Sequence, residues 1–318
     1  MKPFTKLFSF ALILALVFGF FTLQPVSAAP AIVYNAIPAT LPPSMPSQPF
    51  QAQQTFEFGD YVTLAPGSDR ELRTVSVTMV TWAYQSNQPA GWTDPTGWDH
   101  PITINIYNVI PGEPLNTLGS LIATKTQTFH LPWRPEPDLV NCTDNRWYAP
   151  DESCNYGYAF NITFDLTDLD VTLPDSIVLG LAYNTMSYGE DPIGVTGPYD
   201  SLNVGAIGSL SAGTDGNTDR VFWNTITAGW YTDGGAAGVG IFREDTNWGI
   251  YGTIPFQITA DPTPVLCTTD CYVATTGSDS NLGNVDSPFL TVQKGIDTVN
   301  AGGTVHVAAG TYVANLAI

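Results

Sequence analysis

Three oxygen-bearing side chains in one short segment have the spacing with which calcium-binding loops begin. They are Asp215, Asn217 and Asp219, which alternate along the chain so that their oxygens can face one ion. The rest of such a loop is missing, because Arg220 stands where the motif needs glycine and Ile226 stands where it needs a bidentate glutamate. These three residues are therefore candidate metal ligands, and calcium is the one candidate cofactor.

A second oxygen-rich loop, near the C-terminus, carries Asp279, Asn281 and Asp286. Calcium binding is one interpretation, since calcium takes carboxylate and amide oxygens as ligands. The other is turn formation, in which Asp and Asn side chains accept hydrogen bonds from nearby backbone. We favour turn formation, because it accounts for these residues without an ion.

Eight tryptophans suggest carbohydrate binding, since sugar rings pack on flat aromatic faces while carboxylates and amides bond the sugar hydroxyls. Asp94, Asp99 and Asn145 could supply such hydrogen bonds. The alternative is that the large rings fill a core or cover loops, because aromatic side chains bury much area. The candidate platform comprises four tryptophans in or beside turns: Trp92, Trp98, Trp133 and Trp147.

Four cysteines allow three disulfide pairings. Their spacing favours Cys142 with Cys154, across a turn-rich segment, and Cys267 with Cys271. A zinc site built from all four is the competing interpretation, but the spacings differ from the paired C-x2-C pattern of zinc knuckles.

The sequence provides no recognisable catalytic constellation. The zinc-protease H-E-x-x-H, the nucleophile elbow G-x-S-x-G and the phosphate-binding loop are all absent. The three histidines, His100, His130 and His306, are scattered. A pair of carboxylates for glycoside hydrolysis could still be present among the 29 acidic residues, because the spatial separation of such a pair is not encoded locally. We therefore assign no catalytic residue and leave open whether the protein is an enzyme.

Charge and the N-terminus indicate an exported protein. Residues 1–29 combine two lysines, an apolar run and a small-residue end, which together are typical of a cleaved secretory signal. No other stretch is apolar and long enough to span a bilayer, so no membrane attachment is expected after cleavage. The net charge of -19 repels phosphate backbones and argues against nucleic-acid binding. We predict a secreted, extracellular or cell-surface location in a bacterium.

Short strand patterns with Gly, Pro, Asn and Asp turns fill residues 30–260. Apolar residues alternate with polar ones over 73–84, 102–106 and 158–166, as in antiparallel sheets with one buried face. The segment 176–183 is apolar on both sides and is expected to be a central strand, and 239–243 is a further strand candidate. These patterns predict a mainly β fold, an antiparallel β-sandwich of jelly-roll type. Closely spaced prolines then predict a linker over 261–270.

The last segment, 271–318, begins with a short strand and a loop containing Gly277, Asp279 and Asn281. A helical stripe capped by Thr291, a double glycine and β-rich runs follow. This order resembles the N-terminal cap and first coil of right-handed parallel β-helix proteins of the pectate lyase type. The resemblance implies a capping helix and a β-helix that is cut off after its first coil. In that family the catalytic and calcium-binding residues generally lie on later coils, and none can be matched here.

Several phrases within 31–258, such as HPITINIYNV and AFNITFDL, are similar to uncharacterised secreted bacterial β-sandwich domains. That resemblance carries no active site. The leading interpretation is a binding or display module joined to a β-helix, with an extracellular polysaccharide or cell-surface glycan as the partner. The alternative is the N-terminal part of a polysaccharide lyase or glycoside hydrolase whose active site lies on further coils.

Overall fold

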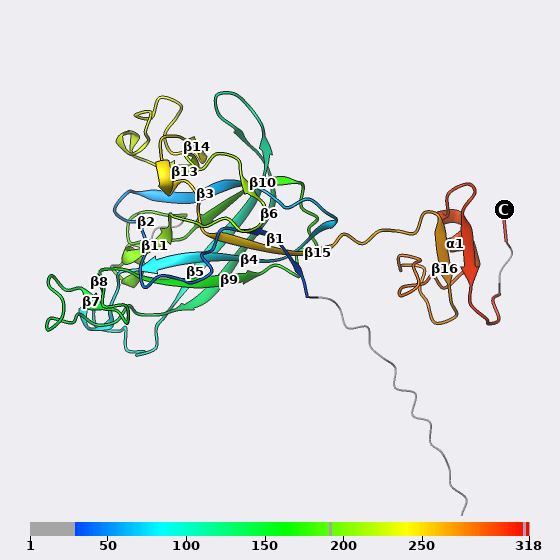
Figure 1. Cartoon of the computed structure of the whole chain (residues 1–318), viewed down its shortest axis with the longest axis horizontal. Coiled ribbons are helices and arrows are strands. Elements are labelled where there is room, and N and C mark those ends of the chain that lie inside the picture. The colour runs from blue at the N-terminus through cyan, green and yellow to red at the C-terminus, as the bar shows by residue number, and fades with distance from the viewer. Residues whose placement is uncertain (1–28, 191–192, 314–315, 318) are drawn as a thin grey trace, which may run out of the picture.

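The computed structural model describes residues 29–190, 193–313 and 316–317. Apart from Ala29, the predicted signal sequence, residues 1–29, lies outside this part of the chain. Within the described residues, no helix combines the length and the apolar character needed to cross a membrane. The fold is mainly β, as predicted, and most of its strands belong to two antiparallel sheets (Figure 1).

The first sheet is organised around the long strand β4 (Asp69–Thr81), which pairs with other strands on both sides. The C-terminal end of β4 lies at the candidate site. Five further strands complete the sheet. In the order of pairing, its strands are β1 (Ala31–Asn35), β15 (Phe256–Pro262), β4 (Asp69–Thr81), β11 (Leu202–Gly205) and β2 (Ser47–Pro49), and β9 (Tyr158–Asp165) pairs with β4.

The second sheet contains a long hairpin at one edge and a wholly buried strand in its middle. Its strands are β14 (Arg243–Asp245), β13 (Val221–Thr225), β3 (Thr55–Thr63), β10 (Ser176–Ala182), β5 (Trp98–Ile110) and β6 (Thr117–Leu131), and β12 (Thr214–Asp215) pairs with β3. Strand β10 lies between β3 and β5, and all its residues after Ser176 are buried. This explains why its sequence is apolar on both sides.

One hydrophobic core takes side chains from strands of both sheets. On β4, Val75, Val77 and Met79 face this core, in agreement with the predicted alternation. Each such side chain contributes roughly 1.5–3 kcal/mol by leaving water. The intervening residues form the opposite face, where Thr78 donates a hydrogen bond to Asn161 at 2.7 Å.

Short elements sit in the connecting loops. They are four 3-10 turns, η1 (Gln85–Asn87), η2 (Pro198–Ser201), η3 (Ala228–Trp230) and η4 (Gly249–Tyr251), and one small hairpin, β7 (Trp147–Tyr148) with β8 (Cys154–Asn155). The strand predicted over 239–243 is wrong except at its last residue. Gly238 and Gly240 have positive φ values there, which interrupt the extended backbone before β14.

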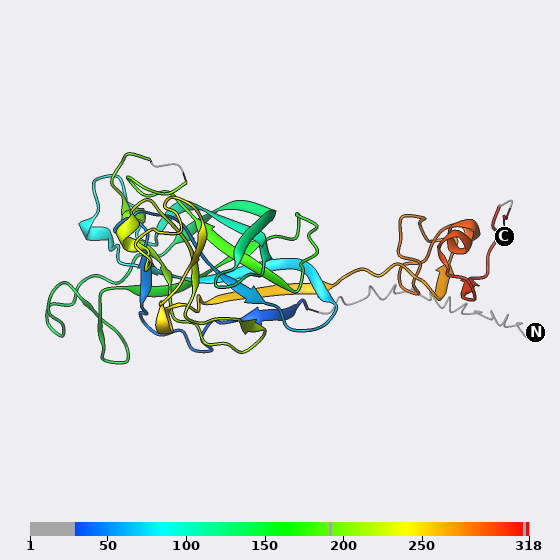
Figure 2. The same cartoon turned by 90° about the horizontal axis from the view of Figure 1, so that it is seen from above.

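Strand β15 continues two residues into the predicted linker, because Asp261 pairs with β4 and accepts a 2.6 Å hydrogen bond from Arg73 Nε. An extended segment then leads to a small C-terminal group of elements (Figures 1 and 2). This group comprises β16 (Asp270–Val273), α1 (Val292–Thr298) and β17 (Thr304–Val307).

The C-terminal group has its own small core, formed by Cys267, Cys271, Val273 and Phe289. Strands β16 and β17 run parallel, and a single parallel bridge joins Val273 to Phe289. Helix α1 begins as predicted, with the Thr291 side chain accepting a hydrogen bond from the backbone N–H of Lys294. Parallel strand pairing in the described residues goes no further, so the β-helix itself stays a prediction.

Candidate functional site

A pocket of about 660 Å³ opens where β2, β11 and the end of β4 meet. Its size lies within the range of small-ligand sites. The segment before β2 and the segment after β8 complete its wall. The lining residues are Ser44, Met45, Pro46, Ser47, Pro49, Ala52, Trp82, Cys154, Asn155, Tyr156, Gly157, Asp200, Ser201 and Asn203.

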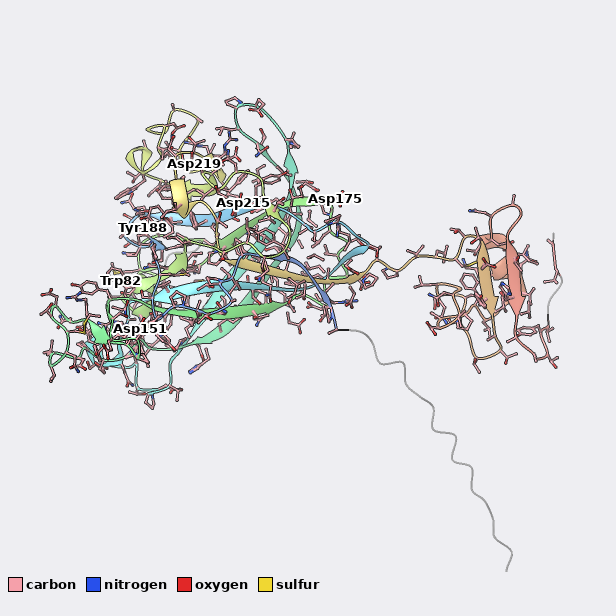
Figure 3. The ribbon with its side chains drawn as sticks, viewed as in Figure 1. Trp82, Asp151, Asp175, Tyr188, Asp215 and Asp219 are labelled. Atoms are coloured by element: carbon pink, nitrogen blue, oxygen red, sulfur yellow. A yellow bond between two sulfur atoms is a disulfide. The ribbon has the colours of Figure 1, made fainter. Side chains whose placement is uncertain are left out.

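Trp82 follows directly after β4 and is the large aromatic residue of this pocket (Figure 3). Its side chain is 48% exposed although its backbone is held on both sides. The Trp82 N–H donates to Ser201 O at 2.9 Å, and Trp82 O accepts from Arg134 Nε at 3.0 Å. The indole is thus displayed on a fixed backbone, an arrangement that reduces the entropy lost on binding.

Arg134 is the buried support of this position. Its guanidinium also donates to Pro135 O and Asn145 O and lies 4.2 Å from the centre of the Tyr84 ring. Burial lowers the Arg134 pKa from its ordinary value, although the side chain keeps its three carbonyl partners. This cation therefore joins the end of β4 to the 134–146 segment and is not directed at a ligand.

Tyr156 stacks with Trp82. The two ring centres are 5.6 Å apart with an interplanar angle of 18°, and Tyr156 is 42% exposed. The Arg146 guanidinium lies 5.7 Å from the Tyr156 ring centre and donates to Thr143 O and Thr143 Oγ1. The pocket wall is thus an exposed aromatic pair, which is the kind of surface on which a sugar ring packs.

The loop that carries Tyr156 is anchored covalently and through one buried tryptophan. Cys142 and Cys154 form a disulfide, in the pairing that their spacing favours, as do Cys267 and Cys271 in the C-terminal group. Trp147 is 4% exposed and its Nε1 donates to Gly157 O at 2.7 Å. A Cβ at Gly157 would lie 2.6 Å from Val80 Cγ1, 2.7 Å from Ser44 Oγ and 3.0 Å from Trp82 Nε1, so a larger residue there would displace these side chains.

Polar groups complete the lining. Asn155 Nδ2 donates to Ser153 Oγ, and Asn203 Nδ2 donates to Ser47 Oγ at 3.3 Å. Asp200 is the one charged residue of the lining, and its carboxylate accepts from the backbone N–H groups of Met186 and Gly197. Amides and hydroxyls can bond sugar hydroxyls, whereas Asp200 holds the neighbouring loop.

Of the four tryptophans predicted as a platform, Trp98 has its ring centre 6.3 Å from those of both Trp92 and Trp133, whereas Trp147 packs against Tyr158. Trp98 and Trp147 are buried, at 3% and 4% exposure, so their faces are closed to a ligand. Trp92 and Trp133 are half-buried against the core, and Trp133 Nε1 donates to Asp94 O. The aromatic pair of the pocket was not among the predicted residues. The alternation in β4 could have indicated the exposure of Trp82. Counted in steps of two along the strand, Trp82 falls on the same face as Thr74, Ser76 and Thr78.

A small pocket brings together four residues named above for sugar binding, Trp92, Trp98, Asp94 and Asp99, and adds His130, which the sequence did not place there. Asp99 and His130 face each other across β5 and β6, and Asp99 Oδ1 lies 2.8 Å from His130 Nδ1. His130 Nε2 lies 3.0 Å from Thr96 Oγ1, which also donates to Asp94. The Asp94 pKa is lowered by these Thr96 hydrogen bonds. The network is exposed to solvent and closes the 94–99 turn onto the hairpin.

The candidate calcium ligands use their oxygens in hydrogen bonds within the turn and with Gly249 and Thr253. Asp215 accepts from the Asn217 N–H and from Thr253 Oγ1, while Asn217 Oδ1 accepts from the Asp219 N–H. Burial raises the Asp215 pKa, which disfavours the anion that a cation needs. Figure 3 shows Asp215 and Asp219 away from Trp82. In the described ranges, His, Cys, Asp and Glu side chains form no group of three or more able to hold a metal ion.

The second oxygen-rich loop also forms turns. Asp279 accepts from the backbone N–H groups of Leu290 and Thr291 and from Thr291 Oγ1, and Asn281 Nδ2 donates to Pro288 O. Burial alone would raise the Asp279 pKa, but these hydrogen bonds together lower it. Asp279 therefore fixes the start of α1.

Glu57 on β3 is a buried carboxyl outside both pockets. It is 9% exposed, and its Oε1 accepts from Asn105 Nδ2 and Tyr107 Oη at 2.9 Å each. A Cβ at Gly180 would lie 2.2 Å from that oxygen, so glycine makes room for it. Burial raises the Glu57 pKa from 4.5 to about 7, although both hydrogen bonds oppose the shift.

Comparison with known proteins finds similarity over short stretches of the chain. Residues 275–317 match a family described as proteins of unknown function (DUF1565). A pectate lyase of Emericella nidulans is 37% identical over 49 residues, which are 15% of this chain and 12% of that protein. No solved structure matches the chain. The chain is thus similar to part of a pectate lyase over one short stretch, and the Trp82 pocket lies outside the matched DUF1565 segment.

Proposed function

We propose that this is a secreted, extracellular or cell-surface protein that binds a polysaccharide in the pocket formed by Trp82 and Tyr156. In this proposal residues 30–260 are a β-sandwich of jelly-roll type, 261–270 are a linker, and 271–318 begin a right-handed parallel β-helix. The binding module then holds the β-helix part of the protein close to its glycan.

The observation that carries the proposal is the exposed aromatic pair. Two stacked rings exposed at 48% and 42% on a pocket wall offer a flat apolar surface to a ligand. The pair is held by the Arg134 hydrogen bonds on one side and by the disulfide loop on the other, so it is preorganised. Amides and hydroxyls of the lining supply the directional contacts that a sugar needs.

Three further observations support an extracellular role. Two disulfides persist in oxidising compartments, and the acidic composition suits an exported protein. The N-terminal pattern of residues 1–29 adds the expected export signal.

A second candidate function is the N-terminal part of a polysaccharide lyase or glycoside hydrolase. The similarity of a 49-residue stretch of this chain to a pectate lyase favours it. In that case the pocket would hold the substrate chain, and the active site would lie on further coils of the β-helix.

Binding to immobilised polysaccharides tests the first proposal. Residues 30–318 are titrated against a panel of plant and microbial glycans, together with Trp82→Ala and Trp230→Ala. Trp230 is a matched control, because it is 43% exposed but does not line the pocket. We expect Trp82→Ala to weaken binding by at least about tenfold, or about 1.4 kcal/mol, and Trp230→Ala to leave it unchanged. Equal binding by all three proteins would refute the assignment of the pocket.

A further inference from the structure

We propose that the pocket selects uncharged glycans and excludes polyuronates such as pectate. This inference rests on the proposed function and specifies its ligand class. It differs from what the similarity to a pectate lyase alone would suggest, because the matched enzyme is named for an anionic polysaccharide.

The first argument is the absence of a cation in the lining. None of the residues that line the pocket is lysine, arginine or histidine, and the single charged one, Asp200, is an anion. Recognition of carboxylates normally uses arginine or lysine, with arginine giving paired hydrogen bonds. A uronate carboxylate placed here would lose water without gaining such a partner.

The two arginines that contact Trp82 and Tyr156 donate their hydrogen bonds to protein oxygens. Arg134 is buried and donates to three backbone carbonyls, those of Trp82, Pro135 and Asn145. Arg146 lies over the Tyr156 ring and donates to the carbonyl and hydroxyl oxygens of Thr143. Turning Arg146 into the pocket would break these contacts.

The second argument is the charge of the whole chain. Its 29 acidic and 10 basic residues give a net charge of -19, which repels a polyanion at low ionic strength. A neutral chain meets no such barrier. It can place an apolar ring face on Trp82 and its hydroxyls near Asn155, Ser201 and Asn203, which line the same pocket.

A matched pair of ligands isolates the charge. Polygalacturonate and its fully methyl-esterified form share one backbone, so residues 30–318 are titrated with both and with neutral galactan and β-glucan. We expect at least one uncharged glycan to bind at least tenfold more tightly than polygalacturonate. Its affinity should change less than twofold between 50 and 500 mM NaCl.

The substitution Asn155→Lys adds a cation to the lining. It is expected to raise the affinity for polygalacturonate at least fivefold and to make that binding sensitive to salt. Polygalacturonate binding as tight as that of every neutral glycan, or no effect of Asn155→Lys, would overturn the inference while the pocket assignment stands. Failure of every glycan to bind, or binding insensitive to Trp82→Ala, would overturn the proposed function and this inference with it.

Discussion

The indole Nε1 of Trp147 donates a hydrogen bond to the carbonyl oxygen of Gly157 at 2.7 Å. This buried contact joins the β7–β8 hairpin to the segment that presents Tyr156, and Gly157 in turn lies against Trp82. A residue that no ligand can reach thus determines the geometry of the exposed aromatic pair.

Replacing this donor tests its importance. Trp147→Phe keeps an aromatic ring but leaves the Gly157 carbonyl without its partner, which is expected to lower the free energy of unfolding by roughly 1–3 kcal/mol. Glycan affinity should also fall severalfold, because Tyr156 loses its support. Thermal unfolding and ligand titration measure the two effects, with Trp230→Phe as the control. Unchanged affinity in Trp147→Phe would contradict the proposed support.

The Cys142–Cys154 disulfide should have a similar effect on the site. Its 12-residue separation corresponds to about 3 kcal/mol of stabilisation in the chain-entropy model. The double variant Cys142→Ser/Cys154→Ser is expected to lower the melting temperature and to weaken glycan binding. Cys267→Ser/Cys271→Ser is the control, because that disulfide lies in the C-terminal group away from the pocket lining. If both double variants reduced affinity equally, the disulfide loop would have no specific role.

Stability should depend on pH through Glu57. Its pKa is about 7 in the fold and 4.5 ordinarily, so the folded protein binds the proton more tightly. The fold favours the neutral carboxyl of Glu57. The contribution of this group to the free energy of unfolding is therefore complete below pH 4.5 and is lost as the pH rises through about 7. The loss is on the order of 3 kcal/mol.

Chemical denaturation at pH 5 and at pH 8 measures the contribution of Glu57 to the free energy of unfolding. Glu57→Gln cannot ionise, so it should lose less stability than the wild type over this interval. Asp60 and Asp215, whose pKa values burial also raises, are present in both proteins and cancel in the difference. Parallel stability curves for the two proteins would show that Glu57 does not titrate in this range.

Asp279 is predicted to hold the C-terminal group together. Asp279→Ala removes the acceptor of three hydrogen bonds at the start of α1 and should make residues 271–317 more sensitive to protease. Asp286→Ala, an exposed carboxylate of the same loop, is the control. Limited proteolysis followed by mass spectrometry identifies the cut. Equal cleavage rates in the two variants would argue against this role.

Local sequence patterns were sufficient to predict structural features that depend on residues close together in the sequence. The alternation in β4 and the two-sided apolar run of β10 predicted strands because side chains of a strand point to opposite faces. Cap chemistry predicted the start of α1 at Thr291, and spacing favoured both disulfide pairings. The strand predicted at 239–243 failed because alternation does not register the positive φ of Gly238 and Gly240.

The sequence by itself therefore determined a mainly β chain and the absence of a recognisable catalytic motif, and its cysteine spacing favoured the observed disulfide pairings. Only the tertiary structure decided which aromatic rings are exposed. Trp82 and Tyr156 are far apart in sequence and meet because Thr81 pairs with Tyr158 across β4 and β9, while Trp98 and Trp147 are covered by other segments. Exposure of a large side chain depends on what the rest of the chain places over it, and periodicity within one strand does not contain that information.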